Sequence, residues 1–136
     1  MCSDLTKPFI KDDTSGHFYQ VFDTKVTWKK ASDLCKYDGG NLVTIESIEE
    51  QTFITDLIKK RTFTVPGLWI GSDKLHLDEQ RAWANGEKMS YANWAPGEPN
   101  SHLIEENCLV IRTKDSTWMD VTCTERNGYI CEISRT

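Results

Sequence analysis

Five cysteines in a chain of 136 residues constrain its fold more than any other feature of the sequence. A chain of this length makes one domain and buries about two thirds of its unfolded surface. So many cysteines in so small a chain favour an oxidising compartment, where disulfides form and persist. Four lie within the body of the chain, at Cys35, Cys108, Cys123 and Cys131, and Cys2 stands alone near its start. The count does not decide which of them pair.

The spacing of the cysteines and histidines is not that of a zinc motif. No two cysteines lie two to four residues apart, and His17, His76 and His102 are not paired at ligand spacing. The sequence therefore predicts no zinc motif of this kind.

Charge and hydropathy exclude two classes of partner. The net charge is -5 and the isoelectric point is about 5.2, whereas binding to a phosphate backbone needs clustered lysines and arginines. No apolar run approaches the roughly 20 residues of a membrane span. Residues 1–4 lack the charged and apolar regions of a secretory signal, so we expect any signal of the precursor to be absent from this chain. We expect no nucleic-acid partner and no membrane insertion.

The first part of the chain predicts one short strand and two helices. Residues 19–22 have strand character, and a helix is expected to begin after Thr27 and to end at the Asp38-Gly39-Gly40 run. A second helix is expected to open at Ser47, because Glu50 three residues later completes a capping box. Its apolar stripe consists of Phe53, Ile54, Leu57 and Ile58.

The second part predicts short strands joined by long loops. Strand signals occupy residues 68–70, 108–111 and 129–131, so the fold class is α+β. Residues 72–107 carry few periodic signals, and a loop of this length in a compact domain is typically functional or disordered. Trp83 and Trp94 argue for order, since each buries a large aromatic surface.

Hard oxygen ligands gather between the cysteines of this second part. Glu98-Pro99-Asn100 is followed by Glu106 and by the Trp118-Met119-Asp120 triplet. Calcium takes about six to eight oxygens from carboxylates, amides, backbone carbonyls and water. Each piece by itself is typical of a solvated loop. Together they predict that Glu98, Asn100, Glu106 and Asp120 bind calcium from loop positions.

This set of motifs resembles the C-type lectin-like domain, from about His17 to Ile133. Besides the acidic motifs, the resemblance rests on Trp69-Ile70-Gly71, on Tyr129-Ile130-Cys131-Glu132 and on the cysteine frame. It implies two helices packed on small antiparallel sheets with a long calcium-binding loop region. Residues 1–16 are then an N-terminal extension, and residues 17–136 are the carbohydrate-recognition domain.

The resemblance also implies which cysteines pair. Its disulfides are Cys35 to Cys131 and Cys108 to Cys123. Cys2 is left over, because the longer family form has a further cysteine, pairing with one upstream, about where this chain has Phe18. An odd thiol in an oxidised protein commonly pairs between chains. We therefore expect a homodimer linked through Cys2.

The resemblance further implies how sugar is bound. In the family, two vicinal hydroxyls of a sugar coordinate the calcium ion, and the same carboxylates and amides hydrogen-bond those hydroxyls. Members with Glu-Pro-Asn generally favour mannose-type sugars, namely mannose, fucose, glucose and N-acetylglucosamine. Gln-Pro-Asp generally accompanies galactose. Glu98-Pro99-Asn100 places this chain in the mannose-type group.

Met119 is a departure from the family pattern, which usually has asparagine there. A thioether neither suits hard calcium nor donates a hydrogen bond. We expect weakened or altered binding, with Met119 offering an apolar contact to the sugar. A second calcium site is expected to be lost, because His76, Gln80 and Ser101 stand where ligands are usual, although Asp73, Asp78 and Glu79 lie nearby.

Three hypotheses about function are compatible with these motifs. The leading one is a secreted, extracellular calcium-dependent lectin for glycans with mannose-type sugars. The alternative keeps the fold, with its sugar site impaired by Met119, for a protein or other non-sugar ligand. The third is a glycosidase using two of Glu98, Glu105, Glu106 and Asp120. A cation would hold these carboxylates ionised, whereas a general acid needs a raised pKa. We therefore expect no enzyme.

Overall fold

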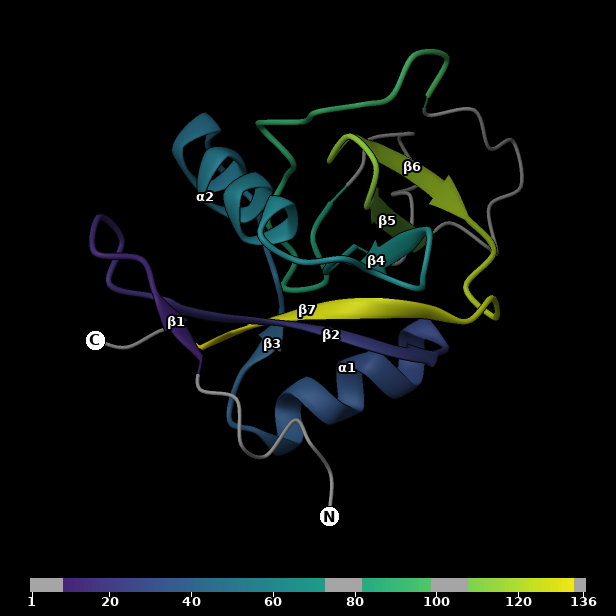
Figure 1. Ribbon diagram of the computed structural model, residues 1–136, viewed down its shortest axis with the longest axis horizontal. Helices are drawn as coiled ribbons and strands as arrows, with labels where there is room; N and C mark the ends of the chain where they lie inside the picture. Colours follow the sequence, from purple (N-terminus) through teal and green to yellow (C-terminus); the bar gives the residue numbers. More distant parts are fainter. Residues whose placement is uncertain (1–8, 73–81, 99–107, 134–136) are drawn as a thin grey trace.

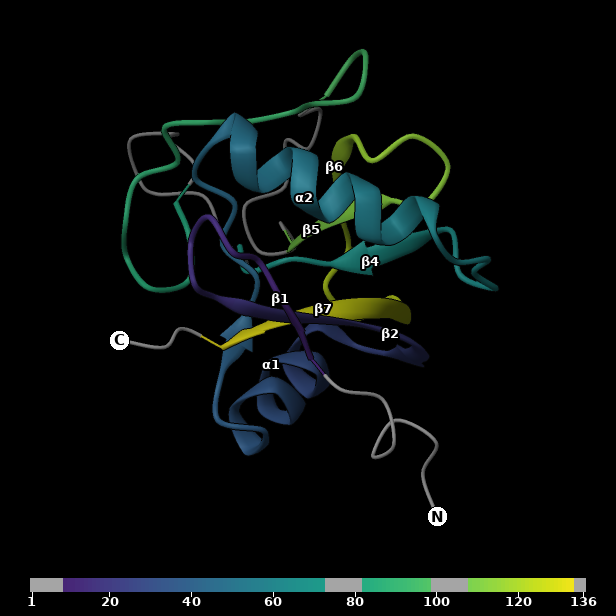
Figure 2. The same ribbon diagram turned by 60° about the vertical axis from the view of Figure 1, so that its left-hand side comes forward.

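The structure is a computed structural model that describes residues 9–72, 82–98 and 108–133. Two helices and seven strands follow one another as β1 (Ile10–Lys11), β2 (Phe18–Val26), α1 (Trp28–Tyr37), β3 (Asn41–Leu42), α2 (Ile48–Lys59), β4 (Gly67–Trp69), β5 (Cys108–Arg112), β6 (Trp118–Val121) and β7 (Asn127–Ile133). Figures 1 and 2 show α1 and α2 on opposite sides of the long β2–β7 pair. The predicted α+β class is confirmed.

All seven strands belong to one sheet. Its order is β1-β2-β7-β4-β5-β6, and β3 pairs with β7 off this path. The pairs are antiparallel except β4 with β7, which is parallel. The sheet is therefore mixed, where the resemblance implied small antiparallel sheets. β7 is buried along nearly all its length because it is covered on both faces.

The helix boundaries follow the local sequence closely. The Thr27 hydroxyl accepts from the Lys30 N–H at 3.3 Å and caps α1, and Gly39 ends it with φ +89°. The Ser47 hydroxyl caps α2 by accepting from the Glu50 N–H at 3.2 Å. The Glu50 carboxylate returns to the N–H of Glu46, one residue before the cap. Both predicted helix starts are confirmed.

The strands are more numerous than predicted, and all the predicted ones except β4 are longer. β2 runs from Phe18 to Val26, with an irregularity between Phe22 and Val26 where it pairs with β7. β1, β3 and β6 were not predicted from the sequence. The first two have only two residues each, so they carry no period of their own and depend on a partner strand.

Two apolar clusters form the core, one on each side of the sheet. The first contains the inner face of α2 with Leu68, Ile111 and Trp118. The second contains the inner face of α1 with Trp69, Val110 and Tyr129. Neither helix in the described part of the chain has the length and apolar character that a membrane crossing needs.

Two disulfides join elements that are distant in the chain. Cys35 of α1 bonds Cys131 of β7, and Cys108 of β5 bonds Cys123 beyond β6. Both implied pairings are confirmed. The second bridge closes a separation of 15 residues, and a loop of about that length contributes about 3 kcal/mol by restricting the unfolded chain. It thereby holds β6 beside β5.

Candidate functional site

The predicted ligand Asp120 lies on strand β6. The sequence predicted a loop position for this residue, and that prediction was wrong. The short run of residues 118–121 shows little alternation of its own and forms a strand because it pairs with β5. A strand position holds the Asp120 backbone rigidly, and the residue is only 7% exposed. The site is therefore built on a sheet edge.

Residues 93–95 are clamped to this strand. The Trp118 N–H donates to the Asn93 carbonyl at 2.8 Å, and the Ala95 N–H donates to the Trp118 carbonyl at 2.9 Å. The carbonyl of Ser116, which has φ 62°, accepts from Asn93 Nδ2 at 2.9 Å and from Gln51 Nε2 at 3.0 Å. These bonds attach the segment after Trp83 to the sheet.

Trp118 is the aromatic anchor of the same segment. Its ring makes edge contacts with Trp83, Tyr91 and Trp94 at centroid distances of 5.6, 5.9 and 5.9 Å. Its indole N–H donates to Gln51 Oε1 of α2 at 2.9 Å. The prediction that Trp83 and Trp94 order this stretch is confirmed for residues 82–98, where Trp83 is fully buried and Trp94 packs against the core.

A tight turn then brings Glu98 to β6. The Glu98 N–H donates to the Ala95 carbonyl at 2.9 Å, and Gly97 has φ +85° within the turn. Glu98 Oε1 accepts from the Asp120 N–H at 3.4 Å. The fold thus brings together two of the predicted ligand residues, Glu98 and Asp120, from positions 22 residues apart.

Met119 faces the other side of β6. Trp118 belongs to the first core cluster, whereas Met119 packs against the second, as the two-residue period of a strand requires. Met119 lines a largely apolar pocket of about 540 Å³ together with Val110 and Val121.

Several predicted residues lie outside the described part of the chain. They are Asn100 and Glu106 of the calcium set, Glu105, Cys2, and the residues weighed for a second calcium site, which are Asp73, His76, Asp78, Glu79, Gln80 and Ser101. The predictions that rest on them remain predictions.

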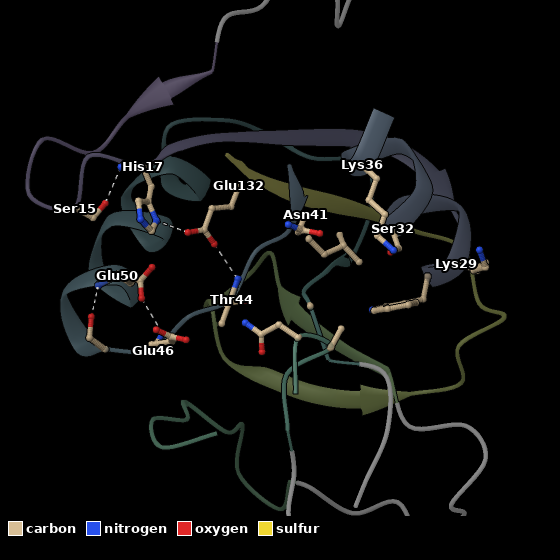
Figure 3. Close-up of a pocket in the computed structure, with 16 residues that line it drawn as sticks. Ser15, His17, Lys29, Ser32, Lys36, Asn41, Thr44, Glu46, Glu50 and Glu132 are labelled. Atoms are coloured by element: carbon tan, nitrogen blue, oxygen red, sulfur yellow. Dashed lines mark hydrogen bonds and ion pairs between the residues drawn. The ribbon is translucent and has the colours of Figure 1, made fainter. Parts of the chain in front are cut away.

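A second polar site, for which no prediction was made from the sequence, lies at the N-terminal end of α2. Its pocket of about 720 Å³ is lined by His17, Glu46, Glu50 and Glu132, among other residues (Figure 3). Burial raises the pKa of Glu132, against the opposing effects of the Thr44 N–H and His17. A hydrogen bond with Glu87, partial burial and neighbouring carboxylates raise the pKa of Glu46 to about 7. The residues come from distant segments, so no local pattern in the sequence marks the site.

Comparison with known proteins places the whole arrangement in one family. Residues 24–133 match the family described as the lectin C-type domain. The chain therefore belongs to the C-type lectin domain family, whose members are generally binding proteins and not enzymes.

Two curated relatives illustrate the range of proteins that contain this domain. Human C-type mannose receptor 2 is 33% identical over 132 residues, which are 96% of this chain and 8% of the receptor. The chain thus spans a small part of that relative. The galactose-specific lectin nattectin of Thalassophryne nattereri is 32% identical over 104 residues, covering 76% of this chain and 65% of the lectin.

Solved structures agree on the fold. Human lithostathine superposes with a TM-score of 0.78 at 25% identity, over 88% of this chain and 92% of that one. The carbohydrate-recognition domain of cow CD23, solved in the presence of a GlcNAc2Man3 oligosaccharide, has a TM-score of 0.74 at 31% identity, with coverage of 88% and 89%.

Proposed function

We propose that this domain is a calcium-dependent lectin that binds mannose-type sugars outside the cell. The observation that carries the proposal is the placement of the Glu98 carboxylate against the Asp120 backbone on β6. Two acidic residues from separate segments meet there on a rigid edge, and oxygen donors of this kind suit calcium. The two disulfides are consistent with an extracellular location.

Four residues would hold the ion. Glu98 and Asp120 meet at β6, and Asn100 and Glu106 complete the set in our proposal. When bound, calcium supplies a positive centre on which two neighbouring sugar hydroxyls are coordinated. The chain's own part is to orient those hydroxyls. Carboxylates only accept hydrogen bonds, whereas the Asn100 amide also donates. Glu98 and Asn100 together can therefore match one arrangement of sugar hydroxyls and reject another.

The preference for mannose-type sugars rests on the order of Glu98 and Asn100. The related structure of cow CD23 was solved with an oligosaccharide that contains mannose and N-acetylglucosamine, whereas nattectin is named for galactose. Glu98-Pro99-Asn100 favours the first of these sugar classes for this chain. One site of this shallow kind binds weakly, so avidity requires several sites together.

Retention on immobilised mannose tests the proposal directly. The protein should bind the resin in calcium and elute with a chelator, and Glu98→Gln should lower retention. Glu125→Gln is a matched control, because Glu125 is an exposed acid after β6. Equal retention with and without calcium, or of Glu98→Gln and wild type, would contradict calcium-mediated sugar binding.

A protein or other non-sugar ligand is the second candidate function, and the position of Met119 favours it. The Met119 side chain packs against the core on the face of β6 opposite Trp118, and its thioether supplies no oxygen ligand. Met119→Asn tests whether this position limits the site. The lectin proposal expects a gain in calcium affinity equivalent to about 1 kcal/mol for a recovered ligand, for which the asparagine side chain must turn toward Asp120. No gain in a calorimetric titration would favour the non-sugar function.

We further propose that Cys2 links two chains. The other four cysteines are consumed in intrachain bridges, and a dimer would present two sugar sites to one surface. Wild type should run as a dimer in non-reducing electrophoresis, and Cys2→Ser as a monomer. A wild-type monomer under these conditions would rule out the covalent dimer.

A further inference from the structure

The largely apolar pocket of about 540 Å³ crosses the sheet from β7 to β6. Its lining residues come from four neighbouring strands, in the order β7, β4, β5 and β6. They lie on the side of the sheet that carries α1, but α1 packs mainly against β3 and β7. The helix therefore leaves the face of β5 and β6 uncovered, and Val110, Met119 and Val121 form an apolar floor there.

Gly67 keeps the middle of the pocket open. A Cβ at this position would lie 3.2 Å from the Cβ and Cγ2 atoms of Val110 and 3.4 Å from Asn127 Oδ1. All three residues line the pocket, so a side chain at position 67 would occupy its space. Thr113 holds the wall beside them, since its hydroxyl donates to the Val65 carbonyl at 3.0 Å. The hollow is therefore a property of the strands themselves.

Asn127 brings one unsatisfied hydrogen-bond donor to the β7 end of the pocket. The residue is only 5% exposed, and its Nδ2 atom has no hydrogen-bond partner in the part of the chain that the structure describes. A buried donor of this kind costs free energy unless an acceptor meets it. The χ2 torsion of asparagine is soft, so the amide can turn its N–H toward a ligand that lies over Gly67. An apolar pocket with one such polar group is typical of small-molecule sites.

The charges at the rim favour a neutral ligand. Arg112 Nε donates to Asp115 Oδ1 at 3.2 Å, so the charge of this arginine is paired. Lys114 and Glu125 are both exposed and carry opposite charges. A charged group placed against Asn127 would lose its hydration without a counter-ion. A neutral acceptor, such as a carbonyl oxygen, avoids this cost.

We propose that this pocket binds a neutral, elongated apolar molecule that carries a carbonyl oxygen at one end. The carbonyl accepts from Asn127 Nδ2, and the apolar body lies across the floor that β5 and β6 form. Three strand spacings separate β7 from β6, so the pocket is about 14 Å long. Met119 suits its place on the floor, because a flexible thioether adapts to the shape of a ligand. The pocket lies on the face of β6 opposite Asp120, so the ligand needs neither calcium nor sugar.

A fluorescence titration with Prodan, a neutral naphthalene with one propionyl carbonyl, tests the site. It is run in chelator, so that the outcome does not depend on calcium or sugar binding. The anisotropy of Prodan should rise as it binds one site on the wild-type protein. Val121→Asp places a charge on the apolar floor and should weaken binding at least about tenfold. Thr124→Asp adds the same charge to the exposed turn after β6, outside the pocket, and should bind as wild type does.

A second comparison isolates the hydrogen bond. Asn127→Leu keeps a side chain of similar size but removes the donor, and it should weaken Prodan binding about fivefold. Dimethylaminonaphthalene lacks the carbonyl, so it should bind wild type and Asn127→Leu equally. Melting curves in chelator establish that each variant is folded. The comparison of the two probes decides the matter even where Val121→Asp does not fold.

Four results would overturn the proposal. The first is a wild type that does not bind Prodan, and the second is unchanged affinity in folded Val121→Asp. The third is an equal loss of affinity for both probes in Asn127→Leu, because it would give the amide a structural part only. The fourth is displacement of Prodan by mannose in calcium, which would place the probe in the sugar site. Failure to bind a mannose resin, in contrast, would leave the Prodan result unchanged.

Discussion

At the scale of single residues, hydrogen bonds to a carboxylate fix the chain at each end of β6. At one end the Asp120 N–H donates to the Glu98 side-chain carboxylate. At the other end, the turn of residues 113–117 leads into the strand. In that turn Asp115 accepts from Arg112 Nη2 and from the Thr117 N–H. Both arrangements place a carboxylate oxygen against a fixed N–H group.

Exchanging the acid and the amide at the proposed sugar site should change its selectivity. Glu98→Gln with Asn100→Asp keeps oxygens for calcium but swaps the hydrogen-bond donor and acceptor around the two hydroxyls. The double variant should bind galactose in preference to mannose on a glycan array. An unchanged ranking would show that selectivity is set elsewhere.

Asp115 should make the stability depend on pH in the acid range. The hydrogen bond from Arg112, with those from Thr117, lowers its pKa from 3.8 to about 2. The charged form is favoured by folding, so its contribution is present above about pH 4 and is lost as the pH falls toward 2. Asp115→Asn should therefore unfold at lower urea than wild type at pH 6, and the two midpoints should converge near pH 2. The effect is small because Asp115 is half-exposed. A difference that grows toward low pH would contradict this assignment.

At the scale of elements, β7 organises the sheet. It pairs with β2, β3 and β4 and carries both Cys131 and Glu132. Close backbone approach is possible because Gly128 has no side chain. A Cβ there would lie 2.5 Å from the Phe22 carbonyl oxygen and 2.8 Å from Leu68 Cδ2.

Gly128→Ala should destabilise the domain strongly. The added methyl group must push β2 or β4 away from β7, and overpacking of this kind costs about 1 to 3 kcal/mol or more. Gly86→Ala is the control, because Gly86 has φ +93° and open space around it. That variant should lose only about 1 kcal/mol for its backbone conformation. Denaturant midpoints of the two variants measure the loss of stability in each. Equal losses would show that the added methyl group at position 128 does not force the strands apart.

At the scale of the whole molecule, calcium binding should raise the free energy of unfolding. Glu98 and Asp120 come from segments that only the folded chain brings together, so a calcium ion held there binds the folded state and not the unfolded one. At a calcium concentration of 100 times Kd, this linkage contributes about 2.7 kcal/mol.

Thermal melting with millimolar calcium and with chelator measures this contribution. The melting temperature should be higher in calcium, and Glu98→Gln should reduce the difference. Glu125→Gln should retain it. Identical wild-type curves in the two buffers would count against calcium binding at β6.

The sequence by itself determined the two helices and the family. Thr27 and Ser47 mark the helix starts because capping is a contact between residues three apart. The motifs around Trp69, Cys108 and Cys131 carried the resemblance to the C-type lectin domain, and with it both disulfide pairings, which the cysteine count alone left open.

Only the tertiary structure decided which side chains meet. β6 becomes a strand through its pairing with β5, and this pairing turns Met119 and Asp120 to opposite faces. His17 and Glu132 are 115 residues apart in the chain and adjoin because β2 pairs with β7. Contacts across a sheet depend on strand order and register, which are set by the burial of the whole core.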